Sequence, residues 1–93
     1  MKICVKLYGN LRTLMNKSEI DIILQNSSTV ADAVTDIATI GDKLRERIFD
    51  ERGKLRNSLI ILRNGSPIEA AHDLTLPLAD GDTLDLFPRV AGG

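Results

Sequence analysis

The sequence predicts one α+β domain, in which a mixed five-stranded sheet carries a main helix on one face and a second, short helix. Apolar and polar residues alternate near both ends of the chain, which is the period of half-buried strands. Apolar residues between positions 30 and 38 recur instead at helical spacing. A chain of 93 residues can bury one modest core, so we expect a single structured domain.

The first two strands are expected to form an antiparallel hairpin. Apolar residues alternate with polar ones over residues 2–7 and again over 19–24. The segment between them contains Asn10 and Asn16, so we expect a loop there.

The main helix is expected to begin after Thr29. Thr29 and Asp32 have the spacing of a capping box, in which each side chain accepts a hydrogen bond from the other residue's backbone N–H. Apolar residues at helical spacing then cover 30–38. Residues 42–51, with alternating charges and Gly53 after them, fit a second, mostly solvated helix.

The remaining strands follow in the last third of the chain. Residues 59–62 form a continuous apolar strand, and Asn64 with Gly65 favours a tight hairpin turn. Proline cannot donate to a strand ladder, so 66–68 can form only a short edge strand. An Asp-Gly-Asp turn at 80–82 then leads into the final strand.

Two aromatic side chains are predicted to point away from the main helix. Leu84 and Leu86 point inward in the last strand, so the same alternation turns Phe87 outward before Pro88 ends the ladder. Tyr8 has the outward phase in the first strand. An exposed apolar patch of this kind marks a docking surface, and drift of the pattern at the strand ends is the alternative.

The order strand, strand, helix, helix, strand, short strand, strand predicts the β-grasp, or ubiquitin-like, arrangement, with the first and last strands central and parallel. We expect residues 1–88 to form this domain and 89–93 to form a flexible tail. The tail ends in Gly92 and Gly93. Either their terminal carboxylate is a reactive group, or the two glycines are only a frayed chain end.

Composition and missing motifs restrict the function further. Twelve Lys and Arg balance thirteen Asp and Glu, which argues against nucleic acid or a membrane surface as partner and leaves protein. No phosphate-binding glycine loop precedes a Lys-Ser or Lys-Thr pair, so we expect this chain not to hold ATP itself. Without a secretory apolar run at its start, the chain is expected to be cytoplasmic.

Four residues with reactive side chains receive structural interpretations. Cys4 is expected to be an inert thiol, and His72, in a predicted loop, lacks companions for a metal or catalytic site. Asp80 and Asp82 are expected to shape a turn. We therefore predict that the chain itself binds neither a cofactor nor a metal.

Three segments carry a family resemblance: Asn64 with Gly65, the run LADGDTL at 78–84, and FPRVAGG at 87–93. With them, the chain resembles the MoaD/ThiS family of ubiquitin-like sulfur carriers over nearly its whole length. The start VKLYGNLR at 5–12 is most similar to the small subunit of molybdopterin synthase. Residues 41–57 are similar to archaeal-type carriers, some of which also serve as protein modifiers.

The resemblance implies a reaction at the C-terminus. In the family, a ubiquitin-activating-type adenylyltransferase uses ATP to adenylate the terminal carboxylate, and a sulfurtransferase supplies the sulfur that turns it into a thiocarboxylate. Gly93 would carry this group, and Gly92 would keep the tail thin enough to enter a narrow channel. The thiocarboxylate would then donate sulfur within molybdopterin synthase, beside the large subunit, so this chain would not be an enzyme alone.

Partner binding is assigned to the two outward aromatic rings and the start of the tail. Arg89 suits an acidic groove or merely keeps the tail soluble, and Val90 suits a small apolar pocket. The predicted partner-binding residues are Tyr8, Phe87, Pro88, Arg89, Val90 and Ala91. The alternative functions are a ubiquitin-like protein modifier, a sulfur carrier for tRNA thiolation or thiamine thiazole synthesis, and an interaction module whose Gly-Gly is incidental.

Overall fold

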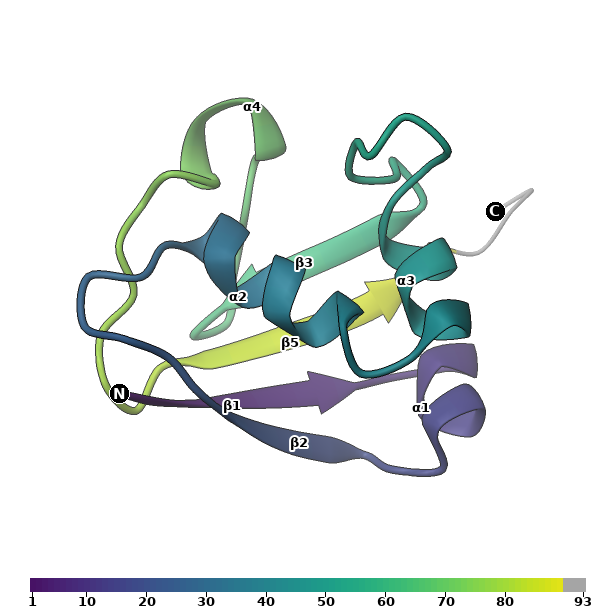
Figure 1. The fold of residues 1–93 in the computed structure, drawn as a ribbon, viewed down its shortest axis with the longest axis horizontal. Coiled ribbons are helices and arrows are strands. Elements are labelled where there is room, and N and C mark those ends of the chain that lie inside the picture. The colour runs from purple at the N-terminus through teal and green to yellow at the C-terminus, as the bar shows by residue number, and fades with distance from the viewer. Residues whose placement is uncertain (90–93) are drawn as a thin grey trace.

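The computed structural model describes residues 1–89, with Ala70 and Ala71 as backbone only, and it has the predicted architecture (Figure 1). A five-stranded mixed sheet has the strand order β2-β1-β5-β3-β4. The elements are β1 (Lys2–Leu7), α1 (Asn10–Met15), β2 (Glu19–Ile23), α2 (Val30–Ala38), α3 (Asp42–Ile48), β3 (Leu59–Arg63), β4 (Ser66–Pro67), α4 (Ala70–Asp73) and β5 (Thr83–Pro88).

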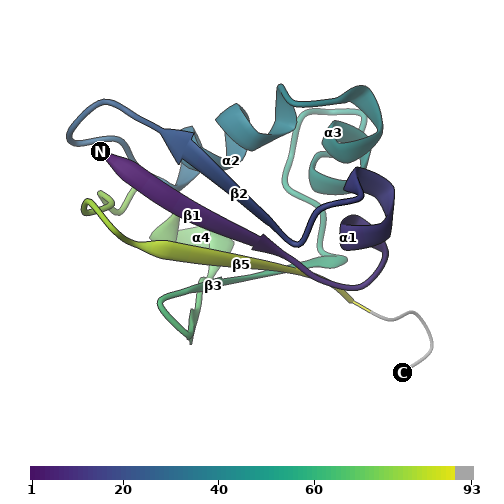
Figure 2. The ribbon, with the colours of Figure 1, turned by 90° about the horizontal axis from the view of Figure 1, so that it is seen from below.

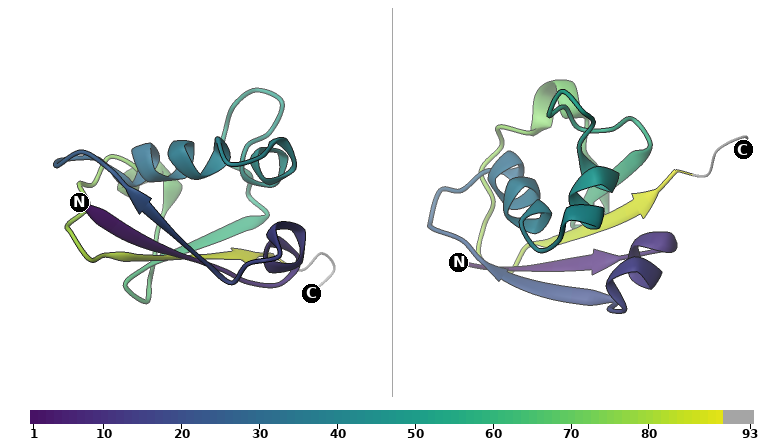
Figure 3. Two further views of the ribbon diagram at one scale, coloured as in Figure 1. Left: turned by 60° about the horizontal axis from the view of Figure 1, so that its bottom comes forward. Right: turned by 45° about the vertical axis from the view of Figure 1, so that its right-hand side comes forward.

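The pairing of the strands confirms the β-grasp arrangement. β1 and β5 are central and parallel, while β2 and β3 flank them in antiparallel directions. The helices lie on one side of the sheet and leave the other side uncovered (Figure 2, and Figure 3, left). The core therefore lies between the sheet and α2 and α3, and the opposite face is open.

The core follows the alternation in the sequence. The inward residues of β1 and β5 are at most 1% exposed, and they pack below the apolar sides of α2 and α3. Burial of such side chains stabilises the fold by roughly 1.5–3 kcal/mol each. The fully buried large side chains are Ile3, Val5, Leu7, Leu11, Val30, Val34, Ile37, Leu44, Ile48, Leu84 and Leu86.

The capping box of α2 is confirmed. Thr29 Oγ1 accepts a hydrogen bond from the Asp32 N–H at 3.2 Å, and Asp32 Oδ2 accepts one from the Thr29 N–H at 2.8 Å. The pair satisfies two N–H groups that the first turn of a helix leaves unpaired.

The expected loop at 10–17 contains a helix instead. The six residues of α1 bury Leu11 and contact α3 and the end of β5. Asn16 ends the helix in the left-handed conformation with φ 53°, which asparagine tolerates better than most residues. An asparagine that suggested a turn is thus a helix C-cap.

The second predicted helix is shorter and more buried than expected. α3 ends at Ile48, because Phe49 is extended and bridges Leu55 across a turn. Leu44 and Ile48 are fully buried, so α3 contributes to the core. His72 lies in the short helix α4, where a loop was expected.

Candidate functional site

An apolar patch lies on the open face of the sheet, at the end toward which β5 runs. We define the patch as Tyr8, Ile60, Leu62 and Phe87, all of which are half-buried. Ile60 is paired with Phe87 across β3 and β5 and alternates with the buried Leu59 and Ile61. The predicted outward orientation of both aromatic rings is confirmed.

The two rings are in direct contact. The ring centroids of Tyr8 and Phe87 lie 4.1 Å apart with an interplanar angle of 11°. The backbone N–H of Tyr8 donates to the carbonyl oxygen of Leu86 at 3.1 Å, which extends the β1–β5 pairing to this point. Stacked aromatic pairs contribute about 0.5–1.5 kcal/mol beyond their buried area, so the stack fixes the end of β5.

Gly9 lies against Pro88, where β5 ends. Gly9 has φ 58° and ψ −135°, a combination that residues with a Cβ rarely adopt. A Cβ added to Gly9 would lie 2.9 Å from Pro88 Cγ and 3.3 Å from Pro88 Cδ. Glycine at position 9 therefore allows the close approach of this segment to Pro88 at the end of β5, a role that the sequence reasoning missed.

A backbone hydrogen bond holds the next residue. The N–H of Arg89 donates to the carbonyl oxygen of Ser58 at 2.6 Å. The Arg89 side chain is exposed, and it lines a pocket of about 100 Å³ together with Arg47 of α3. The structure thus brings Tyr8, Phe87, Pro88 and Arg89 to one end of the sheet.

The other predicted residues of the tail lie outside the described part of the chain. These are Val90, Ala91, Gly92 and Gly93. Their roles, and the boundary of the flexible tail at 89–93, stay predictions.

The Asp-Gly-Asp turn is at the opposite end of β5 and is structural, as predicted. Asp82 is 8% exposed and accepts hydrogen bonds from Ala79 N–H, Asn64 Nδ2, and Nε and Nη2 of Arg63, at 2.8–3.2 Å. Burial raises the pKa of Asp82, but these hydrogen bonds outweigh burial and hold it below the ordinary value. Asp80 Oδ1 accepts a hydrogen bond from the backbone N–H of Lys2 at 2.7 Å.

Cys4 lies half-exposed on the open face, away from the tail. Burial raises the pKa of its thiol, and Glu19 and Asp21 raise it further, so little of the nucleophilic thiolate is present at neutral pH. This agrees with the inert thiol expected from the sequence. Within residues 1–89, no three His, Cys, Asp or Glu side chains gather as metal ligands would.

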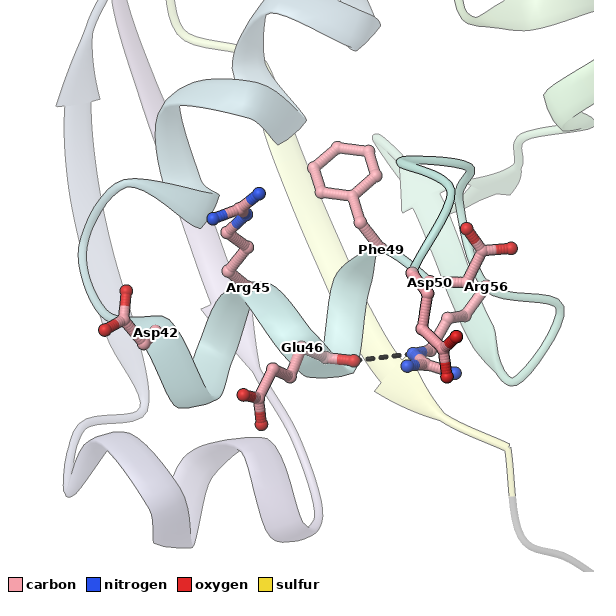
Figure 4. A pocket seen from close by; sticks show the side chains of 7 residues that line it. Asp42, Arg45, Glu46, Phe49, Asp50 and Arg56 are labelled. Atoms are coloured by element: carbon pink, nitrogen blue, oxygen red, sulfur yellow. Dashed lines mark hydrogen bonds between the residues drawn. The ribbon is translucent and has the colours of Figure 1, made fainter.

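A larger hollow lies on the helix side of the molecule, beside α3 (Figure 4). It has a volume of about 380 Å³, and Phe49 points to one side of it while Asp50 points to the other. Arg56 Nε donates to the backbone carbonyl of Glu46 at 2.5 Å, which ties the loop after α3 to that helix. The hollow belongs to the packing of this loop rather than to the open face.

The sequence is similar to a known family and to two curated proteins along nearly its whole length. The model of the ThiS family matches residues 5–93. Small archaeal modifier protein 1 of Haloferax volcanii is 34% identical over 88 residues, which cover 95% of this chain and 97% of that protein. Small archaeal modifier protein 3 of the same organism is 25% identical, with full coverage of both chains.

Solved structures share the fold over the whole chain. The crystal structure of SAMP1 from Haloferax volcanii superposes with a TM-score of 0.89, at 29% identity and full coverage of both chains. A putative molybdopterin converting factor subunit 1 from Pyrococcus furiosus gives 0.77, at 28% identity, covering 97% of this chain and 99% of that one. The Amycolatopsis orientalis BexX/CysO complex contains a chain that gives 0.72, at 25% identity, covering 98% and 99%.

No helix in residues 1–89 is both long enough and apolar enough to span a lipid bilayer.

Proposed function

Because this chain belongs to the ThiS family, we propose that it is a ubiquitin-like carrier whose Gly93 carboxylate is activated by a partner and then transferred or converted. The observation that carries this proposal is the fixed exit of β5. Three contacts fix the position of the chain where it leaves β5. They are the Tyr8–Phe87 stack, the Gly9–Pro88 contact and the hydrogen bond from Arg89 N–H to the Ser58 carbonyl oxygen. The apolar patch lies beside that point, so a partner docked on it would receive the tail.

The chemistry needs activation because a carboxylate is a poor electrophile. Attack of the Gly93 carboxylate on the α-phosphate of ATP releases pyrophosphate and leaves an acyl-adenylate. Hydrosulfide that attacks the acyl carbon expels AMP and leaves a thiocarboxylate, whereas an amine expels AMP and leaves an amide. The residues of this chain position the tail, and a ubiquitin-activating-type adenylyltransferase supplies the ATP site.

Protein modification is one proposed fate of the activated Gly93. Two relatives from Haloferax volcanii are named small archaeal modifier proteins, and the likeness covers nearly all of each chain. Attack by the amine of a lysine on another protein would then join Gly93 to it through an isopeptide bond. These relatives favour modification over the molybdopterin role that the N-terminal resemblance suggested.

Sulfur donation to a pterin precursor is the second candidate. The relative from Pyrococcus furiosus is named as a molybdopterin converting factor subunit, at 28% identity. In this role, a large subunit of molybdopterin synthase would dock on the apolar patch, and a sulfurtransferase would supply the sulfur. Both fates start from the same acyl-adenylate of Gly93. They differ in the nucleophile that attacks its acyl carbon, which is sulfide for sulfur donation and a lysine amine for protein modification.

Intact-mass analysis tests the shared step. The chain is incubated with the adenylyltransferase of its own organism, ATP and a sulfide source. We expect the mass to rise by the exchange of one oxygen for one sulfur, and to stay unchanged when ATP is omitted. An unchanged mass in the complete mixture would contradict the proposal.

Co-incubation with candidate acceptors separates the two fates. A Gly-Gly remnant on lysines of cellular proteins after proteolysis supports the modifier. Loss of the sulfur from Gly93 in the presence of the molybdopterin synthase large subunit and a pterin precursor supports the sulfur donor.

A further inference from the structure

Asp85 occupies an unusual place in the middle of β5. Its backbone register puts it on the open face, between Lys6 of β1 and Leu62 of β3, and two positions before Phe87. The carboxylate oxygen Oδ1 is closed off from water and has no hydrogen-bond partner among the described residues. The residue as a whole is only half-buried.

The surrounding residues leave this oxygen unsatisfied. The ion pairs within residues 1–89 are Lys2–Asp21 and Arg63–Asp82, so Asp85 takes part in neither. Lys6 lies beside Asp85 in the register, but it faces Glu19 of β2 on its other side. A buried polar atom without a partner destabilises a fold, and native structures contain few of them.

The position of Asp85 points to a partner rather than to folding. Leu62 and Phe87 of the apolar patch border it, and a protein docked on the patch would exclude water from the carboxylate. A charged group desolvated in an interface is favourable only when a group of opposite charge and suitable geometry meets it. A lysine or arginine side chain meets both requirements through a charge-assisted hydrogen bond.

We propose that Asp85 is a specificity-determining contact for a lysine or arginine that the activating adenylyltransferase inserts at the border of the apolar patch. The inference rests on the proposed function, because every fate of Gly93 passes through activation. Apolar packing on Tyr8 and Phe87 supplies affinity, and the ion pair at Asp85 selects the partner that carries the matching cation.

The substitution Asp85→Asn tests this inference, since it removes the charge and keeps the shape. The matched control is Asp21→Asn, which makes the same change on the same face at an exposed residue of β2 away from the patch. ATP–pyrophosphate exchange by the adenylyltransferase, measured against carrier concentration, gives KM and kcat. Thermal unfolding of each variant gives its stability.

We expect Asp85→Asn to raise the KM for the carrier about tenfold, with kcat little changed and with a melting temperature equal to or above that of the wild type. Asp21→Asn should change KM by less than about twofold. An unchanged KM for Asp85→Asn would overturn the inference. A lowered melting temperature would also overturn it, because Asp85 would then be paired within the fold, most simply with Lys6.

The proposed function can fail separately in the same experiment. If the wild-type chain supports no exchange, the carrier function is contradicted and the inference falls with it. If the wild type supports exchange and Asp85→Asn behaves identically, only the role of Asp85 is contradicted.

Discussion

The ring of Tyr8 stacks on the ring of Phe87 with centroids 4.1 Å apart, which joins the end of the first strand to the end of the last on the uncovered face of the sheet. The stack serves two purposes at one place. It leaves apolar area on the open face, where we propose that a partner docks, and it holds the strand from which the tail departs.

The first prediction concerns the docking role of Phe87. Phe87→Ala should weaken binding to the activating adenylyltransferase by about 2 kcal/mol, because it removes the aromatic ring that lies between Tyr8 and Ile60 in the patch. Titration calorimetry measures the loss. The control Ile23→Ala truncates an apolar side chain that is 72% exposed on the edge strand β2, and it should leave binding unchanged. A large fall in thermal stability for Phe87→Ala would place the ring in the core instead.

The second prediction concerns the contact of Gly9 with Pro88. Gly9→Ala should destabilise the fold by about 1–3 kcal/mol, since it combines a disfavoured backbone conformation with a clash at 2.9 Å. Gly53→Ala is the matched control, because Gly53 also has a positive φ but an added Cβ there meets no atom within 4 Å. Denaturant unfolding compares them. Equal losses would show that the Pro88 contact does not matter.

The third prediction concerns the buried carboxylate of Asp82. Asp82→Asn should lower the free energy of unfolding by about 1.5–3 kcal/mol at neutral pH, because it weakens the bonds from Arg63 and Asn64. The folded state lowers the pKa of Asp82, so its ionised form stabilises the fold above the unfolded pKa. That contribution is lost as pH falls through the lower folded pKa.

Chemical unfolding of wild type and Asp82→Asn over a series of acidic pH values checks the sign. The difference between the two proteins should be constant near neutral pH and should shrink in acid. A difference that grows in acid would contradict the assignment.

The fourth prediction concerns the two terminal glycines. Gly92→Ala and Gly93→Ala should each reduce kcat/KM for activation about tenfold or more, because a Cβ obstructs entry into a narrow channel. The control is Gly41→Ala, where the backbone is extended and an added Cβ meets nothing within 4 Å. ATP–pyrophosphate exchange measures all three. Full activity of both tail variants would rule out a narrow channel.

The strand alternation and the capping box allowed much of the fold to be predicted. The phase of Leu84 and Leu86 gives the outward direction of Phe87, and Thr29 with Asp32 marks the start of α2. These features are local in sequence, and local periodicity decides them. The helix α1 was not predicted, because a six-residue helix that buries only Leu11 has too little periodicity to stand out.

The contacts around the exit of β5 could not be predicted, because they join segments far apart in the chain. Gly9 meets Pro88, and Ser58 accepts from Arg89, only once β1, β3 and β5 are aligned. The isolation of Asp85 likewise depends on its neighbours across the sheet. The outward phase of Tyr8 and Phe87 pointed to this end of the sheet, and the glycine directly after Tyr8 is the sequence signal that could have revealed the contact with Pro88.

Tandem mass spectrometry of the protein purified from its native cells tests the central claim most directly. The C-terminal peptide should end at Gly93, carrying either sulfur in place of a carboxylate oxygen or an isopeptide bond to a lysine. A native chain that continues past Gly93 without processing, or a Gly93 that stays an unmodified carboxylate while its activating enzyme and ATP are present, would contradict the claim.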